Sequence, residues 1–210
     1  MKTMIKLAVS CVAIFMMTAC IKTNNYRDAV NNNDFEKAHK CLDETYEDFL
    51  DTWESNIGIV DWRIPLLGRS AISSAAMKYS QAASYVLCAE ARYIIANIPD
   101  EANDRIAYLF NEIRVMGEKV DNYYSDGATH YQVDCAKYDC YIQTVKCNNE
   151  LCDVVLNLAI QHHNKELAEL ALSYYRENGE ASFGPIRWRD DDKRTAQAKY
   201  EKALSEGKFD

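Results

Sequence analysis

Residues 69–97 read RSAISSAAMKYSQAASYVLCAEARYIIAN, and this stretch decides the fold class. Its inward positions recur every three or four residues, as they do on one face of an α-helix. They are Ala71, Ala75, Tyr79, Ala82, Ala83 and Val86. Small side chains on such a face allow a neighbouring helix to approach closely. Because Pro99 cannot continue a helix, the sequence predicts one long, closely packed helix over residues 69–97.

The residues before this stretch also show helical spacing of apolar side chains. We expect a short helix over residues 26–33 and a longer one from Phe35 to about Trp53, with Asp34 as its N-cap. Residues 54–68 contain two glycines and a proline among large apolar side chains, including Trp62. They are predicted to form an apolar loop packed against the domain.

The residues after this stretch are predicted to form further helices, with a break at Asn148-Asn149 and a loop over residues 179–192. The expected helices cover residues 101–123, 128–147, 150–163, 165–177 and 193–206, and Asn164 opens the helix at 165–177. No segment alternates apolar and polar residues in the manner of a strand. The chain also has only 7 glycines and 3 prolines. The sequence therefore predicts an all-α fold of antiparallel helical hairpins.

Two pieces of the chain resemble tetratricopeptide repeats. Residues 196–204, AQAKYEKAL, resemble the second helix of such a repeat, and residues 33–38, NDFEKA, resemble the turn into one. The aromatic and glycine residues expected in the first helix of each repeat are missing. The resemblance implies either a tetratricopeptide-like architecture or an irregular bundle, and it implies binding to other proteins.

The amino terminus has the pattern of a secretory signal. Two lysines precede an apolar run from Leu7 to Met17, which is too short to span a bilayer. The run ends in residues 17–20, MTAC, which resemble the lipobox of bacterial lipoproteins. The resemblance implies cleavage after Ala19 and a diacylglycerol on the sulfur of Cys20. The expected organisation is a signal peptide at 1–19, a short tether at 20–25 and a single helical domain at 26–210.

The residues after Cys20 bear on where the lipid anchor faces. Ile21 replaces the aspartate that tends to retain lipoproteins in the inner membrane of enterobacteria, and residues 22–25 contain no acid. Both features favour an outer membrane protein that faces the periplasm. Two or three acyl chains hold a protein stably on a membrane, so the membrane is an expected partner.

The charge of the mature chain limits the class of partner. The leader carries two of the 24 basic residues and none of the 32 acidic ones, which leaves 22 basic and 32 acidic residues and a net charge of −10. Such a charge argues against binding to nucleic acid, which needs a basic surface.

No pattern predicts a cofactor, a metal or a catalytic group. Six cysteines remain beyond the leader and Cys20, and none of them forms a C-x2-C pair of the kind that binds zinc. They are Cys41, Cys88, Cys135, Cys140, Cys147 and Cys152. Because they lie among apolar residues we expect free thiols in the core, although disulfides stay open. Neighbouring His162 and His163 point about 100° apart on a helix, so they cannot share one ion.

One exposed loop has the residue types of a binding surface. Arg187, Trp188 and Arg189 precede three aspartates, and arginine and tryptophan are enriched at binding hot spots. This loop, together with Trp62, is therefore a candidate binding surface; the alternative is a solvated loop whose charges neutralise one another, with Trp188 packed against a helix. The leading hypothesis is a non-enzymatic binding or scaffold domain that acts on another envelope protein. An envelope enzyme of hydrolase type, or a protective immunity lipoprotein from a mobile element, remains an alternative.

Overall fold

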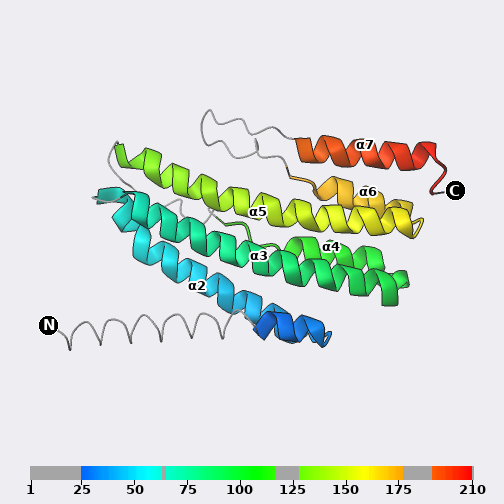
Figure 1. The fold of residues 1–210 in the computed structure, drawn as a ribbon, viewed down its shortest axis with the longest axis horizontal. Coiled ribbons are helices and arrows are strands. Elements are labelled where there is room, and N and C mark those ends of the chain that lie inside the picture. Colours follow the sequence, from blue (N-terminus) through cyan, green and yellow to red (C-terminus); the bar gives the residue numbers. More distant parts are fainter. Residues whose placement is uncertain (1–24, 63–64, 117–127, 177–190, 210) are drawn as a thin grey trace, which may run out of the picture.

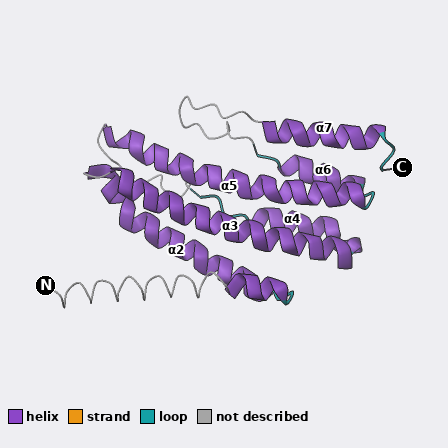
Figure 2. Ribbon diagram, viewed as in Figure 1, coloured by secondary structure: helices purple, strands orange, loops and turns teal. Residues whose placement is uncertain are grey.

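A computed structural model describes residues 25–62, 65–116, 128–176 and 191–209, and every regular element in these residues is a helix (Figure 1). A short helix over residues 25–31 precedes the main elements. These are α2 (Phe35–Trp62), α3 (Pro65–Asn97), a 3-10 turn η1 (Pro99–Glu101), α4 (Ala102–Glu112), α5 (Ala128–Gln161), α6 (Lys165–Tyr174) and α7 (Asp191–Ser205). Figure 2 shows helices and loops and no strand in this part of the chain. The predicted all-α class is confirmed.

The two longest helices, α3 and α5, lie side by side and run in the same direction (Figure 1). Each also forms an antiparallel hairpin, α3 with α2 and α5 with α6, whereas α4 and α7 pack at the margins. The parallel pairing of α3 and α5 is visible in their contacts, because Ser73 bonds to Asp139 and Ser80 bonds to Gln143. The α2–α3 hairpin and the α5–α6 hairpin, joined through the contact between α3 and α5, form the elongated bundle.

Two hairpin turns use the same local geometry. Asn33 and His163 adopt left-handed backbone angles, with φ of 56° and 58°, and so end the preceding helices. The next residue then caps the following helix, since a side-chain oxygen of Asp34 accepts from the Lys37 amide at 3.1 Å and that of Asn164 accepts from the Leu167 amide at 3.0 Å. The N-caps expected at Asp34 and at Asn164 are confirmed.

The predicted apolar loop at 54–68 is wrong, because most of this segment is helical. Helix α2 continues to Trp62 and α3 already begins at Pro65. Trp53 and Ile57 are buried one turn apart, so Ile57 continues the inward face of α2. Pro65 occupies the first position of α3, where a helix does not need the missing amide hydrogen.

The predicted break at Asn148-Asn149 is also wrong, because α5 is continuous from Ala128 to Gln161. Asparagine disfavours helices when its side chain bonds to its own local backbone. Here the side chains bond elsewhere: Asn148 Nδ2 donates to the Tyr174 carbonyl at 2.7 Å and Asn149 Nδ2 to the Arg176 carbonyl at 3.0 Å. The pair therefore joins α5 to the end of α6 and leaves the helix intact.

Two helices end earlier than predicted. Helix α4 ends at Glu112, and Ile113 is extended, with ψ of 108°. Beyond it, the Met116 amide donates to Thr144 Oγ1 at 3.0 Å, which ties the departing chain to α5. Helix α6 ends at Tyr174, and the hydroxyl of the next residue, Tyr175, donates to Asp153.

Five of the six cysteines predicted in the core are buried, and Cys135 is half-buried. All six are free thiols in the structure. All five buried thiols belong to the hydrophobic core, where they pack as small apolar side chains among leucine, valine and alanine.

Candidate binding site

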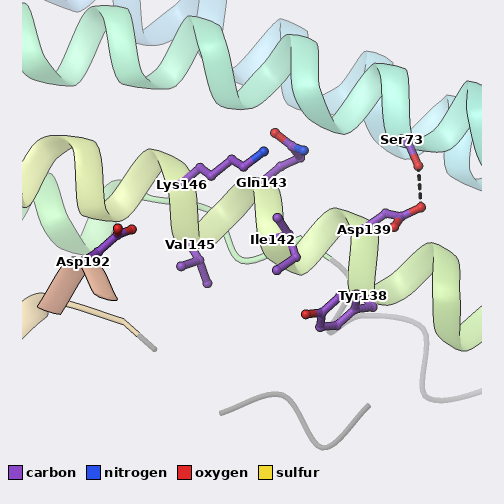
Figure 3. A pocket seen from close by; sticks show the side chains of 8 residues that line it. All are labelled: Ser73, Tyr138, Asp139, Ile142, Gln143, Val145, Lys146 and Asp192. Atoms are coloured by element: carbon purple, nitrogen blue, oxygen red, sulfur yellow. Dashed lines mark hydrogen bonds between the residues drawn. The ribbon is translucent and has the colours of Figure 1, made fainter. Parts of the chain in front are cut away.

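A surface pocket of about 460 Å³ lies along α5, between α3 and α7 (Figure 3). Ser73 of α3 lines one side and Asp192 of α7 lines the other. The remaining lining residues belong to α5 and are Tyr138, Asp139, Ile142, Gln143, Val145 and Lys146. Helix α5 therefore forms the floor of the pocket, and the two neighbouring helices form its walls.

One end of the pocket is held by a bidentate ion pair between α3 and α5. Arg69 Nε donates to Asp139 Oδ2 at 2.7 Å, and Arg69 Nη2 donates to Oδ1 at 3.0 Å. Ser73 Oγ donates to the same Oδ2 at 2.9 Å. Arg69 and Ser73 reach one carboxylate because residues four apart lie on the same face of a helix. Three hydrogen bonds therefore hold the Asp139 carboxylate in place at this end of the pocket.

The rest of the pocket presents polar groups that the described part of the chain leaves without partners. Within these residues, the Gln143 carboxamide, the Lys146 ammonium and the Asp192 carboxylate make no hydrogen bond or ion pair. Figure 3 shows Gln143 and Lys146 projecting towards α3, with Val145 and Tyr138 on the opposite side of α5. The pocket thus offers a cation, an anion and an amide beside apolar surface.

The cysteines near the pocket lack the properties of nucleophiles. Burial raises the pKa of both Cys88 and Cys147 to about 12, and it also raises that of Cys140. A nucleophilic cysteine needs a lowered pKa, because the thiolate is the reactive form. These thiols therefore fit a packing role.

A histidine–carboxylate pair lies elsewhere, between α2 and α3. His39 Nε2 is 2.6 Å from Glu90 Oε2, and both side chains are partly buried, with 24% and 18% of their surface exposed. The hydrogen bond to Glu90 raises the pKa of His39 against the opposing effect of burial. His39 does not line the pocket, and its partner could not be predicted from the sequence because Glu90 lies 51 positions away.

No group of three or more histidine, cysteine, aspartate or glutamate side chains among the described residues is placed to hold a metal ion. Within the same residues, no helix has both the length and the apolar character needed to cross a membrane.

The site residues predicted from the sequence are not those that line the pocket. Cys20, Arg187, Trp188 and Arg189 lie outside the described residues. Trp62 is the last residue of α2, so its predicted place in a loop is wrong. The sequence did not point to Gln143 or Lys146, and it placed Asp192 only at the end of the predicted loop over residues 179–192, because their common pocket exists only once α5 is flanked by α3 and α7.

The chain was compared with protein-family models, curated proteins and solved structures. No protein-family model matches the chain, and neither a curated protein nor a solved structure matches it.

Proposed function

We propose that this chain is a lipid-anchored protein of the bacterial envelope whose helical domain binds another envelope protein through the pocket on α5. Acylation of Cys20 would hold the domain at the outer membrane, facing the periplasm. In this proposal the domain is a non-enzymatic binding or scaffold module. It needs no cofactor, and its net negative charge suits a protein partner better than a nucleic acid.

The observation that carries the binding role is the set of unpaired polar groups in the pocket. Gln143, Lys146 and Asp192 come from two helices and converge on one hollow of about 460 Å³. Binding sites combine apolar surface with a few placed polar groups that set the orientation of the ligand. Ile142 and Val145 supply that apolar surface. Opposite charges at Lys146 and Asp192 would select a partner segment that itself carries both signs.

Site-directed photocrosslinking tests the binding role. A photoreactive amino acid at position 143, in cells of the source organism, is expected to give one discrete adduct with an envelope protein. The matched control places the same group at the exposed Glu47 of α2, outside the pocket. The adduct at position 143 should weaken when Lys146→Glu is added. Equal adducts at both positions, or none at position 143, would refute the proposal.

The lipid anchor has a separate test. Metabolic labelling with an alkyne analogue of palmitate is expected to label the wild-type chain and not a Cys20→Ala variant. The same variant should move from the membrane fraction to the soluble fraction. Persistent labelling of the Cys20→Ala chain would show that the anchor was assigned to the wrong residue.

A further inference from the structure

A second hollow lies further along α3 and α5. It has a volume of about 420 Å³. From α3 it is lined by Gln81, Ser84, Tyr85, Cys88, Ala89 and Arg92, and from α5 by Glu150 and Val154. Most of its lining therefore belongs to α3, whereas α5 supplies most of the first pocket.

The two hollows lie on the same face of α5. Lys146 lines the first and Glu150 lines the second, and residues four apart lie on the same face of a helix. Ser80 Oγ donates a hydrogen bond to the Gln143 carbonyl at 2.8 Å, so the next residue, Gln81, lies at the same height along the two helices as Gln143. From Asp139 to Val154 this face of α5 rises by about 22 Å, at 1.5 Å per residue. We call the surface lined by these two hollows the α3–α5 groove.

The α3–α5 groove also has polar groups without partners in its second half. Among the described residues, the side chains of Gln81, Arg92 and Glu150 make no hydrogen bond or ion pair. Tyr85 is 39% exposed, and the Arg27 guanidinium stacks over its ring at 5.5 Å from the centroid. Tyrosine and arginine are the residue types that most often dominate binding energy at interfaces.

From these features we propose that the α3–α5 groove binds an extended peptide segment of about six or seven residues, the number that spans about 22 Å at 3.3 Å per residue. The segment carries an acidic and a basic side chain two positions apart. This inference rests on the proposed binding function and specifies its ligand. The apolar face of an amphipathic helix would need an apolar strip along the whole groove, and the charged side chains of Lys146, Glu150 and Arg92 interrupt such a strip.

The spacing of the charges supports an extended segment. Lys146 and Glu150 lie one helical turn apart, which is about 6 Å along α5. Side chains two positions apart in an extended chain lie on the same face, separated by about 6.6 Å. An acidic side chain opposite Lys146 therefore places a basic one opposite Glu150. The Gln81 and Gln143 carboxamides each supply donors and an acceptor for the backbone of such a segment.

Three fluorescent heptapeptides test the proposal with the lipidated full chain in detergent. Each places two charged residues two positions apart in a neutral polar background: glutamate with lysine, lysine with lysine, or glutamate with glutamate. Fluorescence anisotropy is expected to show that the wild-type chain binds the glutamate–lysine peptide about tenfold more tightly than either of the others. Each exposed charge pair changes the dissociation constant roughly threefold, and each of the other two peptides exchanges one attractive pair for one repulsive pair.

Two charge-reversal variants should change which of the three peptides binds most tightly. Lys146→Glu makes both positions acidic and is expected to favour the lysine–lysine peptide, whereas Glu150→Lys makes both basic and should favour the glutamate–glutamate peptide. A gain of binding for a new peptide cannot arise from misfolding. Equal binding of all three peptides, no binding of any, or an unchanged preference in the variants would overturn the proposal.

The outcome is separable from that of the proposed function. If crosslinking at position 143 gives its discrete adduct and the heptapeptides do not bind, the extended charged segment is wrong and the binding function stands. If the adduct is absent, the proposed binding function is wrong, whatever the heptapeptides show.

Discussion

Asn149 of α5 exchanges two hydrogen bonds with the backbone of Arg176, beyond the end of α6. Its Nδ2 donates to the Arg176 carbonyl at 3.0 Å, and its Oδ1 accepts from the Arg176 amide at 3.1 Å. The side chain is buried, with 5% of its surface exposed. It satisfies both polar groups of one residue in the way that a neighbouring strand would, and so it secures the point where the chain leaves α6.

Removal of this side chain is expected to destabilise the domain. Asn149→Ala leaves the amide and the carbonyl of Arg176 without their partner, which should lower the free energy of unfolding by about 2 kcal/mol. Urea titration followed by circular dichroism measures the change. The control is Asn111→Ala, because Asn111 is exposed on α4 and bonds only to the Ala107 carbonyl of its own helix. Equal effects of the two substitutions would show that the contact with Arg176 adds nothing.

The His39–Glu90 pair predicts a loss of stability as pH rises. The hydrogen bond to Glu90 raises the pKa of His39 in the folded state above its unfolded value of about 6.5. Protonation is therefore favoured by folding, and its stabilising effect is complete below pH of about 6.5 and disappears as pH rises through the folded pKa. We expect the free energy of unfolding to decline from pH 6.5 upwards.

The variant His39→Gln should flatten this decline while it keeps a polar side chain opposite Glu90. Unfolding by urea at a series of pH values from 5.5 to 8.5 provides the measurement. His162→Gln, at an exposed position, is the matched control and should retain the wild-type slope. A slope that survives in the His39→Gln chain would assign the pH dependence to another group.

The predictions made from the sequence succeeded where local periodicity decided the structure. The alanine-rich face of residues 69–97 predicted α3, and Asp34 and Asn164 predicted helix starts, because capping and spacing act within a few residues. The errors arose where distant contacts overrode local preference. Asn148 and Asn149 remain in a helix because their side chains reach the end of α6, and residues 54–62 extend α2 because Trp53 and Ile57 are buried.

The candidate site could not be predicted in the same way. Nothing in the sequence distinguishes Lys146 and Glu150 from the other charged residues. Only the parallel packing of α3 and α5 places Gln81 and Arg92 beside them. Asp192 comes from a third helix, α7. No sequence separation or spacing pattern specifies that three helices will meet at one pocket.

The Arg69–Asp139 pair is expected to show a measurable coupling energy. A double-mutant cycle with Arg69→Ala and Asp139→Ala should give about 1 kcal/mol, because the contact is bidentate and its side chains are only 34% and 27% exposed. The control cycle uses Arg105 and Glu101, an exposed pair within one helical stretch, for which we expect about 0.3 kcal/mol. Coupling no larger than that of the control would mean that the pair does not hold α3 to α5.

The burial of the thiols predicts which cysteine reacts first. With a pKa of about 12, only about one in 10⁴ of the Cys88 and Cys147 side chains is ionised at pH 8, and their burial further limits access to a reagent. Cys135 is half-buried and is the most accessible thiol among the described residues. With Cys20 acylated as proposed above, a disulfide reagent added to the folded chain at pH 8 should therefore label one thiol rapidly and the others only as the protein unfolds. Cys135→Ser should abolish the rapid phase, whereas Cys147→Ser should leave it unchanged. A rapid phase of two or more thiols in the folded protein would mean that the contact between α3 and α5 opens far more often than this packing implies.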